Sequence, residues 1–193
     1  MSEPSLKRLF DVIYYQQEKY PQPDALGAKI NGQWETTSTE SVIEQTNLVS
    51  QGLLQLGIQP GDKIAMISNN RPEWVIMDLA ALQIGAIDVP IYPTISPDDY
   101  RYIFNDAEVK LCFVSDGELL EKVNEIRDEV PSLQAVYSFD TLEGVQHWTE
   151  VRELGRSGDP AAVTALMDKV QEDDLATLIY TSGTTGVPKG VML

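Results

Sequence analysis

Four short apolar runs recur along the middle of the chain at a constant spacing. Consecutive runs start 24 residues apart, at Lys63 (K-I-A-M-I-S), Ile87 (I-D-V-P-I-Y), Leu111 (L-C-F-V-S) and Ala135 (A-V-Y-S-F). Segments with helical features lie between them, over residues 72–84, 97–105 and 117–129. Strand–helix alternation at this length is typical of βαβ units with right-handed crossovers. Because the runs show little polar alternation, both faces of each strand should be covered. The spacing therefore predicts an α/β fold, a mostly parallel sheet with helices on both faces.

Two local features precede the first run. Residues 25–30 and 33–37 flank Asn31-Gly32, a dipeptide that favours a tight two-residue turn, so we expect a small N-terminal β-hairpin. Apolar residues at helical spacing over residues 5–20 predict an amphipathic helix ended by Pro21. We expect this helix to pack on the body, because its polar face is not basic enough for a membrane surface. Ser41 and Glu44 resemble a capping box at the start of the next helix.

Composition and charge exclude several classes of function. The 193 residues fit one domain, and the formal net charge of −16 argues against nucleic-acid binding, which needs clustered Lys and Arg. A single cysteine, Cys112, excludes internal disulfides and cysteine-based metal sites, and its apolar surroundings predict a buried, inert thiol. One histidine, His147, cannot form a histidine cluster or, with a single cysteine, a conventional nucleophilic site. No apolar stretch predicts a transmembrane segment, and no signal peptide is evident. We expect a cytoplasmic protein, with peripheral membrane association as the alternative.

The last fourteen residues, Y-T-S-G-T-T-G-V-P-K-G-V-M-L, carry the strongest functional signal. Glycines let backbone N–H groups approach a ligand, and successive N–H groups in tight turns form an anion-binding concavity. Hydroxyl side chains add donors at its rim, and Lys189 supplies a mobile positive charge. The plain alternative is a polar hairpin loop. The density of Ser, Thr, Gly and Lys behind an apolar run favours a phosphate-binding loop over Thr181–Gly190.

This loop differs from the Walker A pattern, in which a Ser or Thr follows the lysine and a helix begins. Here Lys189 follows Val187-Pro188, and Gly190 occupies the position of the Ser or Thr. The residues after Gly190 predict a strand instead of a helix. Y-T-S-G-T-T-G-V-P-K-G resembles the signature of the adenylate-forming superfamily, which includes acyl-CoA synthetases, adenylation domains and luciferases. Together with N-N-R-P-E-W and residues 85–94, it is most similar to long-chain fatty acyl-CoA synthetases.

The resemblance implies a reaction and a set of ligands. In the family, a carboxylate attacks the α-phosphorus of ATP, and the acyl group of the adenylate then passes to CoA, with Mg²⁺ neutralising phosphate oxygens. The implied fatty-acid, ATP and CoA substrates need positioning and charge stabilisation more than a nucleophilic side chain. The resemblance assigns phosphate contacts to a set of loop residues, namely Thr181, Ser182, Gly183, Thr184, Thr185, Gly186 and Lys189. It places Thr181 nearest the Mg²⁺, and it identifies no catalytic residue.

The resemblance also implies that residues 1–193 are the N-terminal α/β part of a longer AMP-binding domain. The adenine-binding segment, the acidic Mg²⁺ ligand and the C-terminal lysine domain of the family have no counterpart in these residues. We therefore expect the isolated chain to be inactive as a ligase, and we expect exposed apolar surface through which it could associate with itself. Two alternatives remain: a truncated nucleotide- or phosphate-binding regulatory module, and an adenylation domain that serves a carrier protein.

Two further groups of residues have a functional and a structural interpretation. Asn69–Trp74 follows a strand and begins a helix, where open α/β sheets often bind ligands, but a helix entry with Trp74 in the core explains it better. Asp98, Asp99 and Asp106 form a possible set of acid–base carboxylates, yet helix capping and solvated turns account for them. Neither group carries a predicted role in catalysis.

Overall fold

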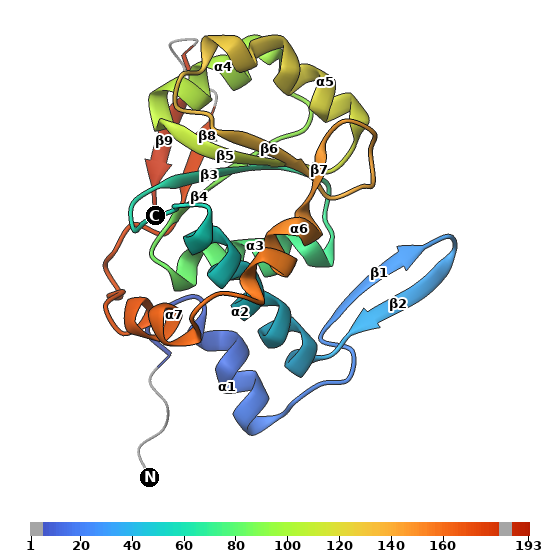
Figure 1. Cartoon of the computed structure of the whole chain (residues 1–193), viewed down its shortest axis with the longest axis vertical. Coiled ribbons are helices and arrows are strands. Elements are labelled where there is room, and N and C mark those ends of the chain that lie inside the picture. The colour runs from blue at the N-terminus through green and yellow to red at the C-terminus, as the bar shows by residue number, and fades with distance from the viewer. Residues whose placement is uncertain (1–5, 182–186) are drawn as a thin grey trace.

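The structure is a computed structural model that describes residues 6–181 and 187–193 (Figure 1). The helices are α1 (Asp11–Lys19), α2 (Thr39–Gln55), α3 (Pro72–Gln83), α4 (Pro97–Ala107), α5 (Gly117–Ile126) with a 3₁₀ turn (Arg127–Glu129), α6 (Trp148–Gly155) and α7 (Pro160–Met167). The strands are β1 (Leu26–Ile30), β2 (Gln33–Thr37), β3 (Lys63–Ile67), β4 (Ile87–Ile91), β5 (Val109–Val114), β6 (Ala135–Ser138), β7 (Gln146–His147), β8 (Leu178–Thr181) and β9 (Lys189–Met192).

A five-stranded parallel sheet forms the centre of the molecule, with strand order β4-β3-β5-β6-β7. In two pairs of neighbouring apolar runs the first residues lie opposite each other in the sheet, so the constant spacing in sequence corresponds to the register of the strands. Lys63 lies opposite Ile87, and Leu111 lies opposite Ala135. The predicted α/β fold with a parallel sheet is therefore confirmed.

Helices cover both faces of this sheet, and each face has its own hydrophobic core. Ile64 and Met66 of β3 enter the core shared with α2, α3, α6 and α7, whereas Ala65 and Ile67 enter the core under α4 and α5. Figure 1 shows α4 and α5 on one side of the sheet and α2, α3 and α6 on the other. Cys112 is fully buried in the second core, where burial raises the pKa of its thiol, in agreement with an inert role.

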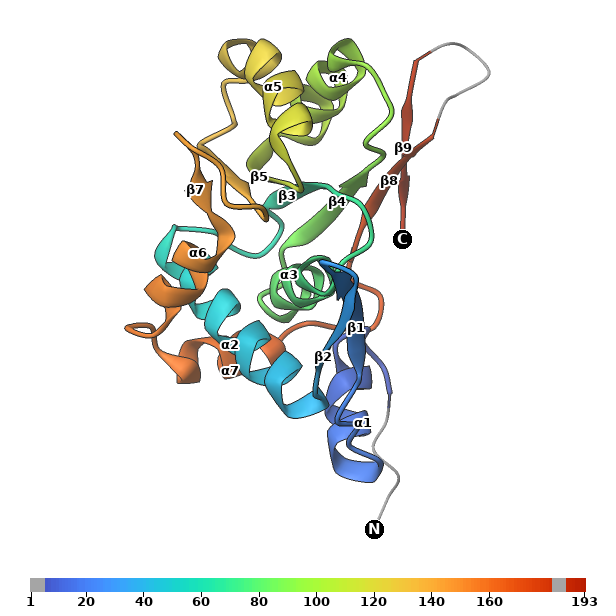
Figure 2. The same cartoon turned by 90° about the vertical axis from the view of Figure 1, so that its right-hand side faces the viewer.

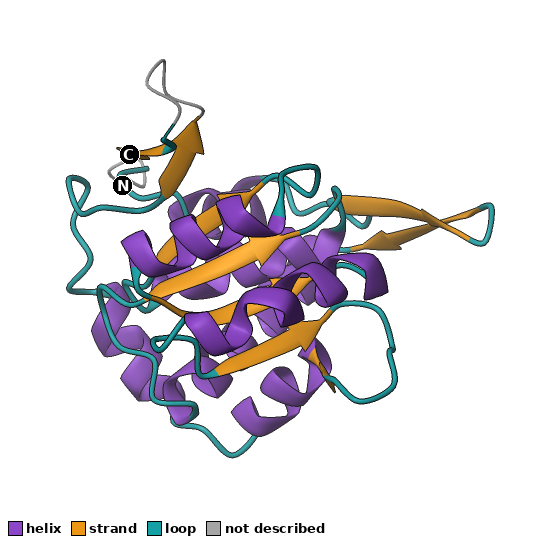
Figure 3. Cartoon of the chain, turned by 90° about the horizontal axis from the view of Figure 1, so that it is seen from above, coloured by secondary structure: helices purple, strands orange, loops and turns teal. Residues whose placement is uncertain are grey.

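The predicted hairpin is present and extends away from the body (Figure 3). β1 and β2 pair antiparallel around Asn31 and Gly32, which have φ angles of 51° and 82°. Both values lie in the left-handed region, as a type I′ turn requires, and this turn matches the twist of the strands. On its surface Trp34 is 72% exposed.

Two helix starts differ from the sequence prediction. The capping box at Ser41 and Glu44 is wrong, because α2 already begins at Thr39. The N-cap is Ser38, whose hydroxyl accepts a hydrogen bond from the Ser41 amide at 3.2 Å. Likewise the sequence suggests a helix over residues 145–154, but α6 begins at Trp148, since the two residues before it form β7 and extend the sheet beside β6. The hydroxyl of Ser38 sets the start of α2, and the pairing of β7 with β6 sets the start of α6.

The crossing of α2 and α6 depends on glycine. A Cβ on Gly52 would lie 1.9 Å from the carbonyl oxygen of Val151, and one on Gly155 would lie 1.8 Å from that of Leu48. Backbone therefore contacts backbone here, and there is no flexible side chain that could move aside. This close approach fixes α6, and with it one wall of the larger core.

We predict that Gly52→Ala lowers the free energy of unfolding by ~3 kcal/mol, because the new methyl group must push two helices apart. Urea denaturation measures this loss. Gly117→Ala is the matched control, since its Cβ would meet its nearest neighbour, Leu142, at 3.9 Å. The control should change stability by less than about 1 kcal/mol. Equal effects of the two substitutions would contradict the tight crossing.

Candidate functional site

The predicted phosphate loop is carried by an antiparallel pair of strands, β8 and β9. Thr181 lies opposite Lys189 at the end of this pair, and both residues are exposed. Side chains of directly opposed residues point to the same face, so the hydroxyl and the ammonium group share one face at the base of the loop. The other predicted loop residues, Ser182, Gly183, Thr184, Thr185 and Gly186, lie outside the described residues. The structure thus places two of the seven predicted residues, and it brings these two together.

The strand that leads into the loop pairs with the main sheet through a single bridge, while its Leu178 and Tyr180 pack into the core under α4 and α5. Thr177 forms an isolated parallel bridge with Asp88 of β4, and the Asp88 amide donates to the Ala176 carbonyl at 3.1 Å. Beyond this point β8 leaves the edge of the sheet and pairs with β9 instead, as Figure 2 shows. The sequence predicted a strand before the loop, but not that this strand would belong to a separate two-stranded sheet.

Tyr180 holds the β8–β9 pair against the body. It is 8% exposed, and its hydroxyl donates to the Asp106 carboxylate on α4 at 2.5 Å. Its ring lies over Gly190, where a Cβ would come within 3.1 Å of the ring. Asp106 is exposed, in line with its interpretation as a solvated carboxylate, but it lies on α4 and accepts a hydrogen bond that the sequence did not indicate. A contact across 74 residues leaves no local signal in the sequence.

A second candidate region lies at the carboxyl edge of the parallel sheet. The strand order reverses between β3 and β5, and ligands of open α/β folds commonly bind at such a switch point. A pocket of about 600 Å³ lies there, between the β1–β2 hairpin and the loops that follow β3, β5 and β6. Its polar walls include the predicted segment Asn69–Arg71, together with Ser115, Asp116 and Asp140.

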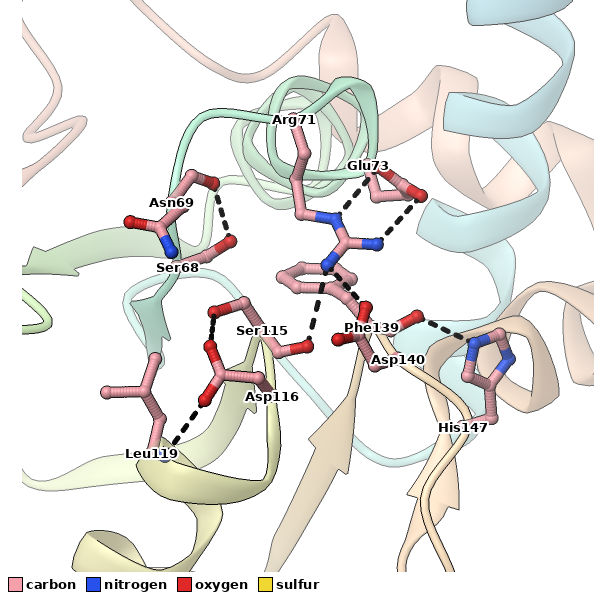
Figure 4. Close-up of polar contacts among 10 residues, drawn as sticks. All are labelled: Ser68, Asn69, Arg71, Glu73, Ser115, Asp116, Leu119, Phe139, Asp140 and His147. Atoms are coloured by element: carbon pink, nitrogen blue, oxygen red, sulfur yellow. Dashed lines mark hydrogen bonds and ion pairs between the residues drawn. The ribbon is translucent and has the colours of Figure 1, made fainter. Parts of the chain in front are cut away.

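Arg71 ties the loops of this region together (Figure 4). Its Nε and Nη2 donate to the two carboxylate oxygens of Glu73 at 3.0 and 3.1 Å, and its Nη1 donates to Asp140 at 3.0 Å. The guanidinium also lies over the Phe139 ring, 5.2 Å from the centroid. Because these groups already occupy most of its donors, Arg71 serves as a cross-link between loops, not as a free anion-binding group. The helix-entry interpretation of this segment fits the structure.

The charge of Arg71 also controls the ionisation of Glu73. Burial alone would raise the pKa of Glu73, but the hydrogen bonds and the charge of Arg71 lower it overall. His147, the single histidine, is occupied as well, with Nε2 at 2.8 Å from the Phe139 carbonyl oxygen and Nδ1 at 2.6 Å from the Thr149 hydroxyl. Trp74 packs half-buried against the larger core, as expected.

Acidic residues do not assemble a metal centre within residues 6–181 and 187–193, where no group of three His, Cys, Asp or Glu could hold an ion. Asp99 instead completes a capping box with Ser96, and Asp98 pairs with Arg101 at 2.8 Å. The capping interpretation is confirmed for Asp99, whereas Asp98 is an exposed, ion-paired carboxylate in the first turn of α4.

Comparison with known proteins identifies the family. Residues 13–193 match the family described as AMP-binding enzyme. The chain belongs to this family. Long-chain-fatty-acid–CoA ligase FadD15 of Mycobacterium bovis is 38% identical over 164 residues, and human long-chain-fatty-acid–CoA ligase ACSBG1 is 33% identical over 187 residues. These alignments cover 85% and 94% of the chain but 27% and 26% of the relatives, so the chain spans about a quarter of their length.

Solved structures show the same fold in adenylate-forming enzymes. The anthranilate CoA ligase AuaEII in complex with anthranoyl-AMP has a TM-score of 0.77 at 22% identity, covering 96% of this chain and 33% of that protein. A red-emitting luciferase from Phrixothrix hirtus also has a TM-score of 0.77, at 19% identity, covering 97% of this chain and 35% of the luciferase. At such identities the likeness concerns the fold of this member of the AMP-binding enzyme family.

Four exposed apolar side chains of this family member lie around one pocket. Leu6, Leu9, Val12 and Leu193 line this apolar pocket of about 870 Å³, and all four are more than half exposed. Exposed apolar surface was expected, whereas association through it stays a prediction. Among the described residues, no helix is long and apolar enough to cross a membrane.

We predict that Arg71→Met destabilises the protein by about 1–3 kcal/mol near neutral pH, because Glu73 loses its charged partner. Glu73 has a lowered pKa when folded, so its contribution is present above the unfolded pKa and is lost as pH falls. The difference from the original protein should therefore shrink below about pH 4. Thermal and urea unfolding across pH measure it.

The control for this substitution is Arg101→Met, which removes an arginine paired with the exposed carboxylates of Asp98 and Glu129. Exposed pairs contribute less, so we expect a loss below about 1 kcal/mol. If Arg101→Met cost as much as Arg71→Met, the cross-linking role of Arg71 would be wrong.

We predict that Tyr180→Phe costs about 1 kcal/mol of stability, since the ring still covers Gly190 but the hydrogen bond to Asp106 is lost. Denaturant titration measures the effect. Tyr102→Phe, at an exposed position of the same helix as Asp106, should leave stability unchanged. Indistinguishable results for the two tyrosines would show that the Asp106 contact does not hold the β8–β9 pair.

Proposed function

We propose that this chain is part of an ATP-dependent fatty acyl-CoA ligase and contains the loop that binds the ATP phosphates. The parent enzyme activates a fatty acid as acyl-adenylate and transfers the acyl group to CoA. Membership of the AMP-binding enzyme family supports the class, and the two long-chain-fatty-acid–CoA ligases support the substrate. The observation that carries the proposal is the pairing of Thr181 with Lys189 across the base of the loop.

The geometry of this pair fits a polyphosphate. A lysine ammonium is a compact charge on a flexible stem that can follow phosphate oxygens, and a hydroxyl donates one hydrogen bond. Both groups are exposed on one face, so they are free to contact a ligand held by the loop. In the proposal, Thr181, Lys189 and the intervening Ser182, Gly183, Thr184, Thr185 and Gly186 contact the β- and γ-phosphates.

Mg²⁺ and CoA belong to the same proposal. When bound beside Thr181, Mg²⁺ would neutralise phosphate charge during loss of pyrophosphate. The chain has a net charge of −16, which repels anionic nucleotides at long range, so local donors and a bound cation must provide the attraction. Thr181 and Lys189 themselves bind and orient the leaving phosphates. Peripheral contact of the parent enzyme with a membrane remains a further part of this proposal.

Two other functions lead to different measurements. A regulatory phosphate-binding module would bind polyphosphate with the same residues but would not require a carboxylic acid. A carrier-linked adenylation domain would use the same loop and pass the acyl group to a phosphopantetheine arm. The two ligase relatives support the CoA ligase, because both are named for CoA.

We predict that Lys189→Ala weakens binding of magnesium pyrophosphate to this chain by about tenfold, equivalent to ~1.4 kcal/mol, because one phosphate-contacting charge is lost. Isothermal titration calorimetry measures it. Lys29→Ala, which removes an exposed lysine from the β1–β2 hairpin, is the control and should bind like the original protein.

The same preparation tests the rest of the proposal. We expect no acyl-adenylate from ATP and palmitate, since the chain spans about a quarter of its ligase relatives. Detection of adenylate would refute this expectation. Equal pyrophosphate affinity of the original protein and Lys189→Ala would refute the role of Lys189, and absence of binding would refute the phosphate grip.

A further inference from the structure

Two carboxyl groups lie next to each other where helix α3 covers the edge strand of the sheet. Asp78, half-buried on α3, and Asp88, buried on β4, have side chains within hydrogen-bonding reach of each other. Asp88 is only 2% exposed, and it lies opposite Ile64, whose side chain belongs to the core shared with α3. Two adjacent carboxylates shielded from water repel each other, so this position favours one bound proton.

This pair lies directly beneath the attachment of the loop-bearing strand. The Asp88 amide donates to Ala176, and Asp88 forms the single bridge to Thr177. Bridge partners on adjacent strands point to the same face, which puts the Thr177 hydroxyl beside the carboxyl pair. Asp88 Oδ1 and Thr177 Oγ1 are both buried, and neither has a hydrogen-bond partner among the described residues. The junction therefore combines a single-bridge strand pairing with two buried polar atoms that lack a partner among the described residues.

Within the part of the chain that the structure describes, no cation offsets the charge of the pair. Ionisable residues on the surrounding elements are Glu73 on α3, Lys63 on β3, Tyr180 on β8, Lys189 on β9, Lys29 on β1, and Glu40 and Glu44 on α2. Glu73 is bonded to Arg71, Tyr180 to Asp106, and Lys63 is one residue from Ile64 and so points to the opposite face. Among the described residues, none of these groups affects the pKa of Asp78 or Asp88.

Burial and mutual repulsion decide the protonation of the pair. Burial raises the pKa of Asp78 to about 6, and burial together with the charge of Asp78 raises that of Asp88 well above its usual range. The folded protein thus keeps a proton that the unfolded chain loses near pH 4. By linkage, the free energy of unfolding decreases as the pH rises from about 4 through the pKa values of the folded pair. Two buried charges within hydrogen-bond distance would then remain, and hydration can relieve them by opening the junction with β8.

We propose that the Asp78–Asp88 pair is a protonation-dependent clasp that positions β8, and hence the phosphate loop, against the sheet. With one proton, the pair is bonded and the Asp88–Thr177 bridge is closed. Loss of that proton opens the bridge and frees the strand that leads into Thr181. The effect on phosphate binding rests on the proposed function, whereas the effect on strand attachment does not.

Amide hydrogen exchange of the 193-residue chain between pH 6 and pH 9 tests the clasp without any nucleotide. After division by the intrinsic exchange rate, protection of the Asp88 amide and of residues 177–181 should fall by up to about tenfold per pH unit, the limit for one linked proton. Amides of β5 are the internal reference and should keep their protection. Asp88→Asn and Asp78→Asn each replace one carboxyl by a near-isosteric amide that bonds without a proton, so both should abolish the fall.

Asp98→Asn makes the same chemical change at an exposed carboxylate and should keep the original pH profile. A profile that is flat in the original protein, or unchanged in both Asn variants, overturns the clasp. Magnesium pyrophosphate titrated over the same range provides the second readout, with affinity that falls in the original protein and not in Asp88→Asn. Affinity independent of pH overturns the positioning of the loop. If pyrophosphate does not bind at any pH, the proposed function is refuted. Amide hydrogen exchange alone then tests whether the clasp exists.

Discussion

Burial of the parallel sheet on both faces is the constraint on which the rest of the structure depends. β3 is bonded to β4 on one side and to β5 on the other, and it sends alternate side chains into two separate cores. Such a strand has little room for polar side chains, since each buried polar group requires a partner. Polar groups that act on ligands must therefore lie at strand ends, in loops, or on an added element such as the β8–β9 pair. Asp88 on β4 and Ser138 on β6 are buried polar exceptions within the sheet.

Much of the fold could be predicted because its signals are local. The 24-residue spacing of the apolar runs, the Asn31-Gly32 turn and the capping role of Asp99 each depend on neighbouring residues, and each was found in the structure. The start of α2 was missed because Ser38 and Ser41 are equally good caps in sequence, and the preceding strand decides between them. The close contact at Gly52 was missed because a glycine inside a helix gives no indication of what crosses it.

The sequence predicts the chemistry of the candidate site but not the contacts that hold it in place. The residue types of Thr181–Gly190 already indicate phosphate binding, since backbone N–H groups, hydroxyls and a lysine are what an anion requires. What holds this segment is non-local: the Tyr180–Asp106 bond, the Tyr180 ring over Gly190, and the bridge at Thr177. None of these contacts follows a sequence period, so a single sequence contains no pattern that would reveal them. Arg71 shows the reverse case, in which a residue suited to a ligand is occupied by its own neighbours.

A phosphate loop is effective only if its ends are already in place before the ligand arrives. Ordering a free segment at the moment of binding consumes part of the binding free energy, and small displacements of the contacting groups reduce catalysis sharply. The antiparallel pairing fixes Thr181 and Lys189 relative to each other, and Tyr180 fixes the pair relative to α4. The parallel sheet contributes one bridge, at Asp88, so the attachment there is the least redundant of the three. A titratable pair at that position therefore acts where a small change in free energy has the largest effect on the loop.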